Sequence, residues 1–146
     1  MGYVVQEYLD KPHLVDDLKY DLRIYVLLYG ISPMRIYIHD QGLARFATET
    51  YTAPKASNLS NLYMHLTNYS INKTNAAFIQ NQGGKKNKAY GEDDEDSEEI
   101  ESDESEESGH KRSLNAILKI LLQQGADPDK IMEEIKDIIV KTLIIG

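Results

Sequence analysis

The sequence contains no cysteine, no tryptophan and no long apolar run. The absence of cysteine excludes disulfide bonds and thiolate zinc sites. No stretch approaches the roughly 18 to 20 consecutive apolar residues that a membrane-spanning helix requires, so we expect no transmembrane segment. The first residues lack a basic region followed by an apolar run, so no secretory signal peptide is visible. Gln6 stands where a myristoylation signal needs serine or threonine, so that signal is absent too. These absences fit a cytoplasmic protein.

The histidines also show no spacing typical of metal ligands, and we interpret them as structural or exposed side chains: His13, His39, His65 and His110. The sequence therefore offers no candidate metal ligands. It also offers no side chain that can be assigned a catalytic role.

Negative charge is concentrated in one segment. The chain has 24 acidic and 16 basic residues and a formal net charge of −8. Residues 92–107 hold 12 of the acidic residues and no lysine or arginine, which leaves 12 acidic against 16 basic residues elsewhere. The rest of the chain is therefore mildly basic, which suits an acidic partner such as nucleotide phosphates or a glutamate-rich protein tail. We expect no nucleic acid among the partners.

Strand patterns occupy the first 50 residues. Apolar and β-branched residues predict a short strand over residues 3–9, and residues 21–29 predict a long strand with both faces covered. Turn residues follow at 30–33, and residues 35–39 alternate like a half-buried strand. Residues 40–42 predict a hairpin turn, with residues 43–48 as the returning strand. Residues 50–80 show no sustained period and predict an ordered loop, with one strand over residues 64–67.

Two helices are predicted near the end of the chain. Apolar residues at positions 114, 117, 118, 121 and 122 follow the spacing of a helix over residues 113–124, and Gly125 suits its C-terminal cap. Asp127 and Pro128 are typical of the start of a second helix, which continues to about residue 143. Strands followed by helices indicate an α+β fold.

The chain is expected to divide into three parts. Residues 1–82 hold the strands and active-site loops, residues 83–109 form a disordered acidic insert, and residues 110–146 form a two-helix segment of the same domain. The insert is too polar to bury enough apolar surface to offset the entropy of ordering it. A sharper hypothesis is that this insert mimics a glutamate-rich tail and competes for the basic surface.

Charged residues interrupt the long apolar strand at its start. Lys19, Asp21 and Arg23 alternate with Tyr20 and Leu22. Burying a charge costs several kcal/mol unless it is paired, so three charges at one strand end indicate that a charged group is held there. An ordinary Lys–Asp pair at a strand start is the alternative.

Several motifs in this order resemble the tubulin tyrosine ligase-like family, whose fold is ATP-grasp. They are Gln6-Glu7-Tyr8-Leu9, Lys19-Tyr20-Asp21-Leu22-Arg23, Gly42-Leu43-Ala44-Arg45-Phe46, the run from His65 to Lys73, Gly109-His110-Lys111-Arg112 and Ile138-Ile139-Val140-Lys141-Thr142. Within that family the sequence is most similar to the tubulin polyglutamylases. The resemblance implies an incomplete ATP-grasp catalytic core, in which antiparallel strands precede two helices.

The resemblance also implies two sets of site residues. Those expected to contact ATP are Gln6, Glu7, Tyr8, Leu9, Lys19, Tyr20, Asp21, Thr67 and Asn68. Those expected to contact the incoming amino acid are Arg45, Tyr69, Ser70 and Lys111. Arg45 would bind a carboxylate through two parallel hydrogen bonds, which lysine cannot reproduce. Arg23 is expected to be structural.

Members of this family add an amino acid to a glutamate side chain, so the resemblance implies ATP-dependent addition of free glutamate to tubulin C-terminal tails. ATP phosphorylates the acceptor carboxylate, and the amino group then attacks the acyl phosphate. The family's Mg²⁺ ligands lie beyond the second helix, so this chain is expected to be a partial domain that is inactive alone. Microtubules, cilia and basal bodies are the expected setting.

Two alternatives remain open at this point. The first alternative to a glutamate ligase is a catalytically inactive truncated paralogue that only binds tubulin tails. The second is a ligase of the same family that uses tyrosine or glycine. Apolar helix faces and strands without neighbours further predict marginal stability or aggregation of the chain alone.

Overall fold

The computed structural model describes residues 2–79 and 109–145. Four strands form one sheet in the order β1-β2-β3-β4, and helices follow it, which confirms the predicted α+β class. The elements, in chain order, are β1 (Leu14–Val15), β2 (Leu18–Ile31), β3 (Met34–Phe46), α1 (Leu62–His65), α2 (Tyr69–Asn72), β4 (Lys111–Ser113), α3 (Leu114–Gln123) and α4 (Pro128–Ile145). The expected insert, residues 83–109, lies outside the described residues except for Gly109.

The chain folds into two compact units that interleave in the sequence. The first comprises Met1–Asp21 and Arg45–Ile79, and the second comprises Leu22–Ala44 and Gln80–Gly146. Strands β2 and β3 each run through both units. The first unit contains most of the predicted site residues, and the second contains the distal hairpin, α3 and α4.

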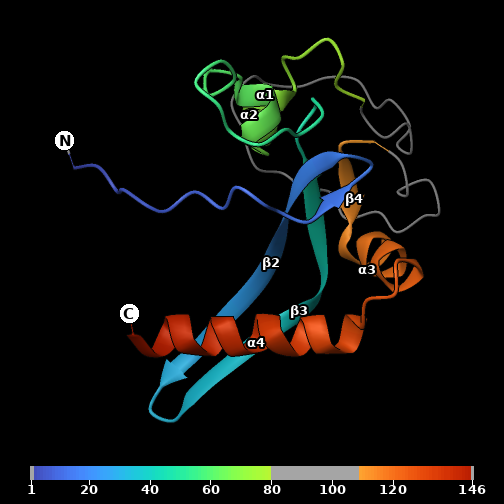
Figure 1. Cartoon of the computed structure of the whole chain (residues 1–146). Coiled ribbons are helices and arrows are strands. Elements are labelled where there is room, and N and C mark those ends of the chain that lie inside the picture. Colours follow the sequence, from blue (N-terminus) through green and yellow to red (C-terminus); the bar gives the residue numbers. More distant parts are fainter. Residues whose placement is uncertain (1, 80–108, 146) are drawn as a thin grey trace, which may run out of the picture. The chain divides into compact units, whose positions relative to one another are not determined.

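The long hairpin of β2 and β3 is the most extended feature (Figure 1). Its turn lies between Ile31 and Met34, as residues 30–33 predicted, and Gly30 has a φ of +80° there. The two strands are antiparallel because so short a turn joins them. Strand β1 extends the sheet on the other side of β2, with Leu14 opposite Lys19 and Val15 opposite Leu18.

The second predicted hairpin turn, at residues 40–42, is wrong. Strand β3 continues through this point without a break. Gly42 suggested a turn, but it instead allows the backbones of β2 and β3 to lie close together. A Cβ at Gly42 would lie 2.7 Å from the Arg23 carbonyl oxygen on β2. It would also lie 3.3 Å from a methyl group of Leu114. Glycine is thus required here by packing across the sheet.

Two other predicted strands are also wrong. Residues 3–9 are extended, but they join no sheet within the described part of the chain, and Tyr3, Val4 and Val5 are almost fully exposed. Residues 64–67 contain the end of the helical turn α1. The prediction that both faces of the long strand would be covered is wrong, because residues 18–25 are only half-buried and residues 26–31 are exposed.

Both predicted helices are confirmed, together with the predicted caps at Gly125 and Asp127, and the structure adds Ser113 as the N-terminal cap of α3. The Ser113 hydroxyl accepts a hydrogen bond from the Ala116 amide at 3.1 Å, and α3 buries Leu114, Ile117 and Leu121. Gly125 has a φ of +88° just after α3, as a C-terminal cap requires. The Asp127 carboxylate then accepts a hydrogen bond from the Asp129 amide at the start of α4.

Helix α4 buries none of its residues, and Ile138, Ile144 and Ile145 are exposed. Within residues 2–79 and 109–145, no helix combines the length and apolar character needed to cross a membrane.

The close approach at Gly42 is testable by adding a single methyl group. Gly42→Ala should destabilise the chain by about 1–3 kcal/mol, because the Cβ meets a backbone carbonyl that cannot move without disturbing the ladder. Gly2→Ala is the matched control, since its Cβ would meet nothing within 4 Å. Urea unfolding followed by circular dichroism measures both variants, and equal midpoints would contradict the close packing.

Candidate functional site

Most of the predicted site residues belong to the first compact unit, where they form three groups. Tyr8 and Lys19 meet the end of α1, Asp21 pairs with Arg45, and Thr67 to Ser70 lead from α1 into α2. Lys111 opens β4 in the second unit, where it is half-buried.

The ammonium of Lys19 lies against neutral oxygen atoms. Its Nζ donates to the Tyr8 hydroxyl at 3.1 Å and to the His65 carbonyl at 3.0 Å, and it sits 4.5 Å from the centre of the Tyr8 ring. Within the described residues, no carboxylate lies within ion-pair distance of it. The described part of the chain therefore does not neutralise this half-buried positive charge.

The segment expected to hold adenine is extended and exposed. Gln6, Glu7 and Leu9 are exposed, and Tyr8 anchors the segment through its hydroxyl. Within the described part of the chain, the main chain of residues 6–9 forms no hydrogen bonds. Its N–H and C=O groups are therefore not engaged by secondary structure.

A buried histidine stands behind Lys19 and Tyr8. His65 is 7% exposed; its Nδ1 lies 2.9 Å from the Tyr8 hydroxyl and its Nε2 lies 3.1 Å from the Asn58 carbonyl oxygen. The rings of Tyr8 and Tyr51 meet it edge to face. The sequence predicts His65 to be a structural or exposed side chain, and its position in the sequence does not indicate these contacts.

Tyr51 closes the same cluster from the loop that follows β3. Its hydroxyl donates to the Asp10 carbonyl at 2.8 Å, which ties this loop to the N-terminal segment. Burial is the main cause that raises the pKa of Tyr51 to about 12, and its interaction with Tyr8 adds to the effect. Burial also raises the pKa of Tyr20, whose ring stacks on Phe46.

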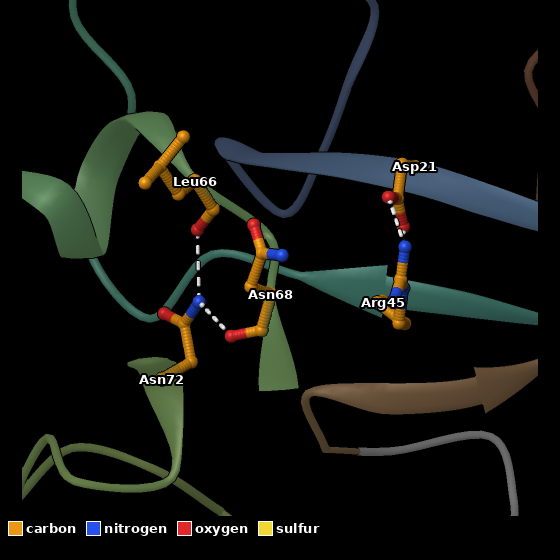
Figure 2. Close-up of polar contacts among 5 residues, drawn as sticks. All are labelled: Asp21, Arg45, Leu66, Asn68 and Asn72. Atoms are coloured by element: carbon orange, nitrogen blue, oxygen red, sulfur yellow. Dashed lines mark hydrogen bonds and ion pairs between the residues drawn. The ribbon is translucent and has the colours of Figure 1, made fainter. Parts of the chain in front are cut away.

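Asp21 and Arg45 form a two-point ion pair across β2 and β3 (Figure 2). Arg45 Nε donates to Asp21 Oδ1 at 3.0 Å, and Nη2 donates to Oδ2 at 2.7 Å. Ala44 and Phe46 are buried on the other face of β3, so Arg45 is directed away from that core. One edge of the guanidinium fork thus already holds a carboxylate of the kind expected from a substrate.

The approach to α2 is held by Asn72, which the sequence reading missed. Asn72 is 1% exposed, and Figure 2 shows its amide nitrogen donating to the carbonyls of Leu66 and Asn68, at 2.8 and 3.0 Å. Its amide oxygen accepts from the Thr48 amide and hydroxyl at 3.0 and 2.9 Å. The only sequence signal is that Asn68, Asn72 and Asn75 recur in one polar stretch, which does not indicate which of them is buried.

The remaining predicted residues have different degrees of exposure. Thr67 is buried, and the exposed Asn68 side chain has no hydrogen-bond partner among the described residues. Tyr69 and Ser70 are exposed, with the Tyr69 ring against Phe78 and below the Lys73 ammonium. Residues 67–70 therefore carry polar side chains, and the side chain of Asn72 holds the main chain at the start of this segment through hydrogen bonds.

Acidic and histidine side chains do not converge anywhere in the described ranges, 2–79 and 109–145. No group of three or more of them is placed to hold a metal ion. The Mg²⁺ that the resemblance implies is expected to have its ligands outside this chain, and we assign that ion no step.

The buried amide of Asn72 can be tested with a nearly isosteric change. Asn72→Asp replaces the donating NH₂ group by an oxygen that faces two carbonyls, and it should destabilise the chain by about 3 kcal/mol or more. Asn115→Asp is the matched control, because Asn115 is exposed in the first turn of α3, where a negative charge is tolerated. Denaturant unfolding distinguishes them, and similar losses would refute the role assigned to Asn72.

The raised pKa of Tyr51 predicts a pH dependence. The folded state keeps this proton above pH 10, where an unfolded tyrosine loses it, so stability present below about pH 10 should decline until about pH 12. The slope from this group should approach about 1.4 kcal/mol per pH unit. Tyr51→Phe should flatten the pH profile of the unfolding free energy over this interval. Parallel profiles for the two proteins would be evidence against a buried, protonated Tyr51.

Comparison with known proteins places these residues in a family context. Residues 1–95 match the model of the tubulin-tyrosine ligase family. The chain is 46% identical over 142 residues to a probable beta-tubulin polyglutamylase of Tetrahymena thermophila, covering 97% of this chain and 10% of that protein. It is 42% identical over 143 residues to a tubulin polyglutamylase of Xenopus tropicalis, covering 98% of this chain and 13% of that protein.

A tubulin monoglutamylase of Homo sapiens is also 42% identical, over 141 residues that cover 97% of this chain and 10% of that protein. The chain thus spans about a tenth of the length of these relatives. The family match covers well over half of the chain, and the similarity to the relatives runs over nearly all of it. The chain belongs to the tubulin-tyrosine ligase family.

Proposed function

We propose that the chain is part of an ATP-dependent ligase that adds glutamate to glutamate side chains in tubulin C-terminal tails. The observation that carries this proposal is the similarity, over almost the whole chain, to proteins named as tubulin glutamylases. These relatives include both polyglutamylases and a monoglutamylase. Their names therefore support glutamate as the added amino acid. We propose a polyglutamylase rather than a monoglutamylase, because the chain is 46% identical to the probable polyglutamylase of Tetrahymena thermophila.

ATP is the proposed nucleotide. The main chain of residues 6–9 is extended and exposed, which leaves adjacent donors and acceptors for the edge of adenine. Lys19 supplies a positive charge that no described carboxylate neutralises, as a phosphate-binding lysine should. Tyr20, Asp21, Thr67 and Asn68 complete the proposed contacts with the nucleotide.

Free glutamate is the proposed incoming amino acid. Arg45 is the proposed partner of its carboxylate, with Tyr69, Ser70 and Lys111 as further contacts. The Asp21 carboxylate holds one edge of the Arg45 guanidinium in a bidentate pair. We infer that the substrate carboxylate either replaces Asp21 or approaches the pair from another direction, and that Asp21 keeps the guanidinium ordered.

The proposed chemistry has two steps. An acceptor carboxylate of the tubulin tail attacks the terminal phosphorus of ATP, which forms an acyl phosphate and releases ADP. The amino group of glutamate then attacks the acyl carbon, inorganic phosphate leaves with the bonding electrons, and the nitrogen loses a proton to give the amide. Lys19 and Arg45 would contribute positive charge near the phosphates and the incoming carboxylate.

Binding of tubulin tails without chemistry is the second candidate for the 146-residue chain by itself. Lys19 keeps a positive charge that no carboxylate of the described residues neutralises, and such a charge suits an acidic tail whether or not a reaction follows. We expect ligation from a longer protein that carries this chain and none from residues 1–146 alone.

A microtubule or cytoskeletal location follows from the proposed substrate, with cilia and basal bodies as the proposed sites.

The test uses a longer protein that contains this chain, with labelled glutamate, glycine and tyrosine competing for a tubulin-tail peptide. Glutamate should be incorporated in preference to the other two. Arg45→Lys should lower kcat/KM for glutamate by roughly 10- to 100-fold, the effect of losing a charged, two-point hydrogen bond. Arg35→Lys is the matched control, because Arg35 is an exposed arginine on the same strand.

Preference for glycine or tyrosine would overturn glutamate as the substrate. Equal activity of the two lysine variants would instead remove Arg45 from the proposed site and leave the substrate assignment intact.

A further inference from the structure

The ammonium of Lys19 is held in place by a chain of oriented neutral groups that begins at a buried histidine. Lys19, Tyr8 and His65 come from three separate segments: the start of β2, the exposed N-terminal segment and the end of α1. All three belong to the first compact unit. The directions of their hydrogen bonds follow from which atoms are able to donate.

The Asn58 carbonyl oxygen can only accept, so the Nε2 atom of His65, 3.1 Å away, carries a hydrogen. In the neutral imidazole, Nδ1 is then an acceptor, and the Tyr8 hydroxyl donates to it at 2.9 Å. This leaves the lone pairs of the Tyr8 oxygen to face Lys19, whose ammonium can only donate. The histidine thus determines which way the tyrosine hydroxyl points.

The position of Lys19 is consequently fixed at three points. Two of its N–H groups are engaged, by the Tyr8 oxygen and by the His65 carbonyl, and the ammonium also lies over the Tyr8 ring. The third N–H group has no acceptor among the described residues. All three contacts are with neutral groups, so they order the ammonium without cancelling its charge.

We propose that His65 and Tyr8 are positioning residues that orient the Lys19 ammonium toward a phosphate group of the bound nucleotide. The assignment rests on the proposed function, since it takes ATP to be the ligand. A lysine stem is flexible, and fixing it before binding reduces the entropy that binding must overcome. Tyr8 also lies in the segment proposed to hold adenine, so one hydroxyl connects the adenine end of the site to its phosphate-binding charge.

The first test concerns Lys19 itself and requires no ligand. In nitrogen-15 NMR spectra of residues 1–146, the His65 ring should be the neutral tautomer with hydrogen on Nε2. The Lys19 ammonium should exchange its protons slowly with water, and Tyr8→Phe should speed this exchange by roughly 3- to 10-fold, the effect of one lost hydrogen bond. Tyr63→Phe is the matched control, because Tyr63 lies in the same unit and, among the described residues, its hydroxyl bonds only with Thr74.

The second test compares ATP with adenosine, which lacks phosphates, by titration of the same proteins. Tyr8→Phe should lower the ratio of ATP affinity to adenosine affinity by roughly 3- to 10-fold, whereas Tyr63→Phe should leave this ratio unchanged. A general loss of structure would weaken both ligands together, so the ratio of the two affinities separates positioning from stability.

Three results would overturn the proposal: hydrogen on Nδ1 of His65, Lys19 exchange that Tyr8→Phe leaves unchanged, or an unchanged ratio of ATP to adenosine affinity. In those cases the proposed nucleotide site stands as long as the unsubstituted chain binds ATP more tightly than adenosine. If the unsubstituted chain shows no such preference, the proposed nucleotide contact of Lys19 fails, and the positioning role fails with it.

Discussion

The geometry of the first compact unit depends on one buried amide. Asn72 uses both of its donors and both acceptor lone pairs, and it joins the end of β3, at Thr48, to the polypeptide between α1 and α2. Helices α1 and α2 contain four residues each, which is too short for either to be stable by itself. The segment from Leu66 to Asn68 therefore takes its shape from Asn72. Because that amide is buried and fully satisfied, no other side chain of its size fits the position.

The polar groups of this unit differ in how their charge is compensated, and the difference separates structural roles from binding roles. Asn72 is neutral and fully paired. Asp21 and Arg45 cancel each other's charge, while Lys19 is ordered by neutral partners and keeps its charge. An anion gains most from the last arrangement, because no carboxylate of the described residues competes for the ammonium. Two of these arrangements, the ion pair of Asp21 and the neutral contacts of Lys19, begin at neighbouring positions at the start of β2, where charged residues interrupt an apolar strand.

Local chemistry predicted the helices, whereas contacts between distant segments decided the predictions that failed. Gly125 ends α3 and Asp127 caps α4 as the sequence indicated, because a cap involves only neighbouring residues. Gly42 was assigned to a turn because a glycine that admits a nearby backbone has the same sequence signature as a glycine in a turn. The pairing of Arg45 with Asp21, and of Tyr8 with His65, joins residues 24 and 57 positions apart, and no local pattern specifies such pairs.

The ion pair of Asp21 and Arg45 sets the energetic requirement for binding a carboxylate at this arginine. The two side chains are 38% and 27% exposed, so water screens their attraction, and pairs of this kind contribute about 0–1 kcal/mol. If the proposed substrate carboxylate replaces Asp21 at Arg45, the pairing that is lost is therefore modest, and the partly exposed Asp21 carboxylate must be hydrated instead. The gain from Asp21 is instead geometric: a two-point contact holds the guanidinium plane in one orientation before any ligand arrives. Arg45 and Lys19 are therefore both ordered in advance, the arginine by the carboxylate of Asp21 and the lysine by neutral groups that leave its charge available.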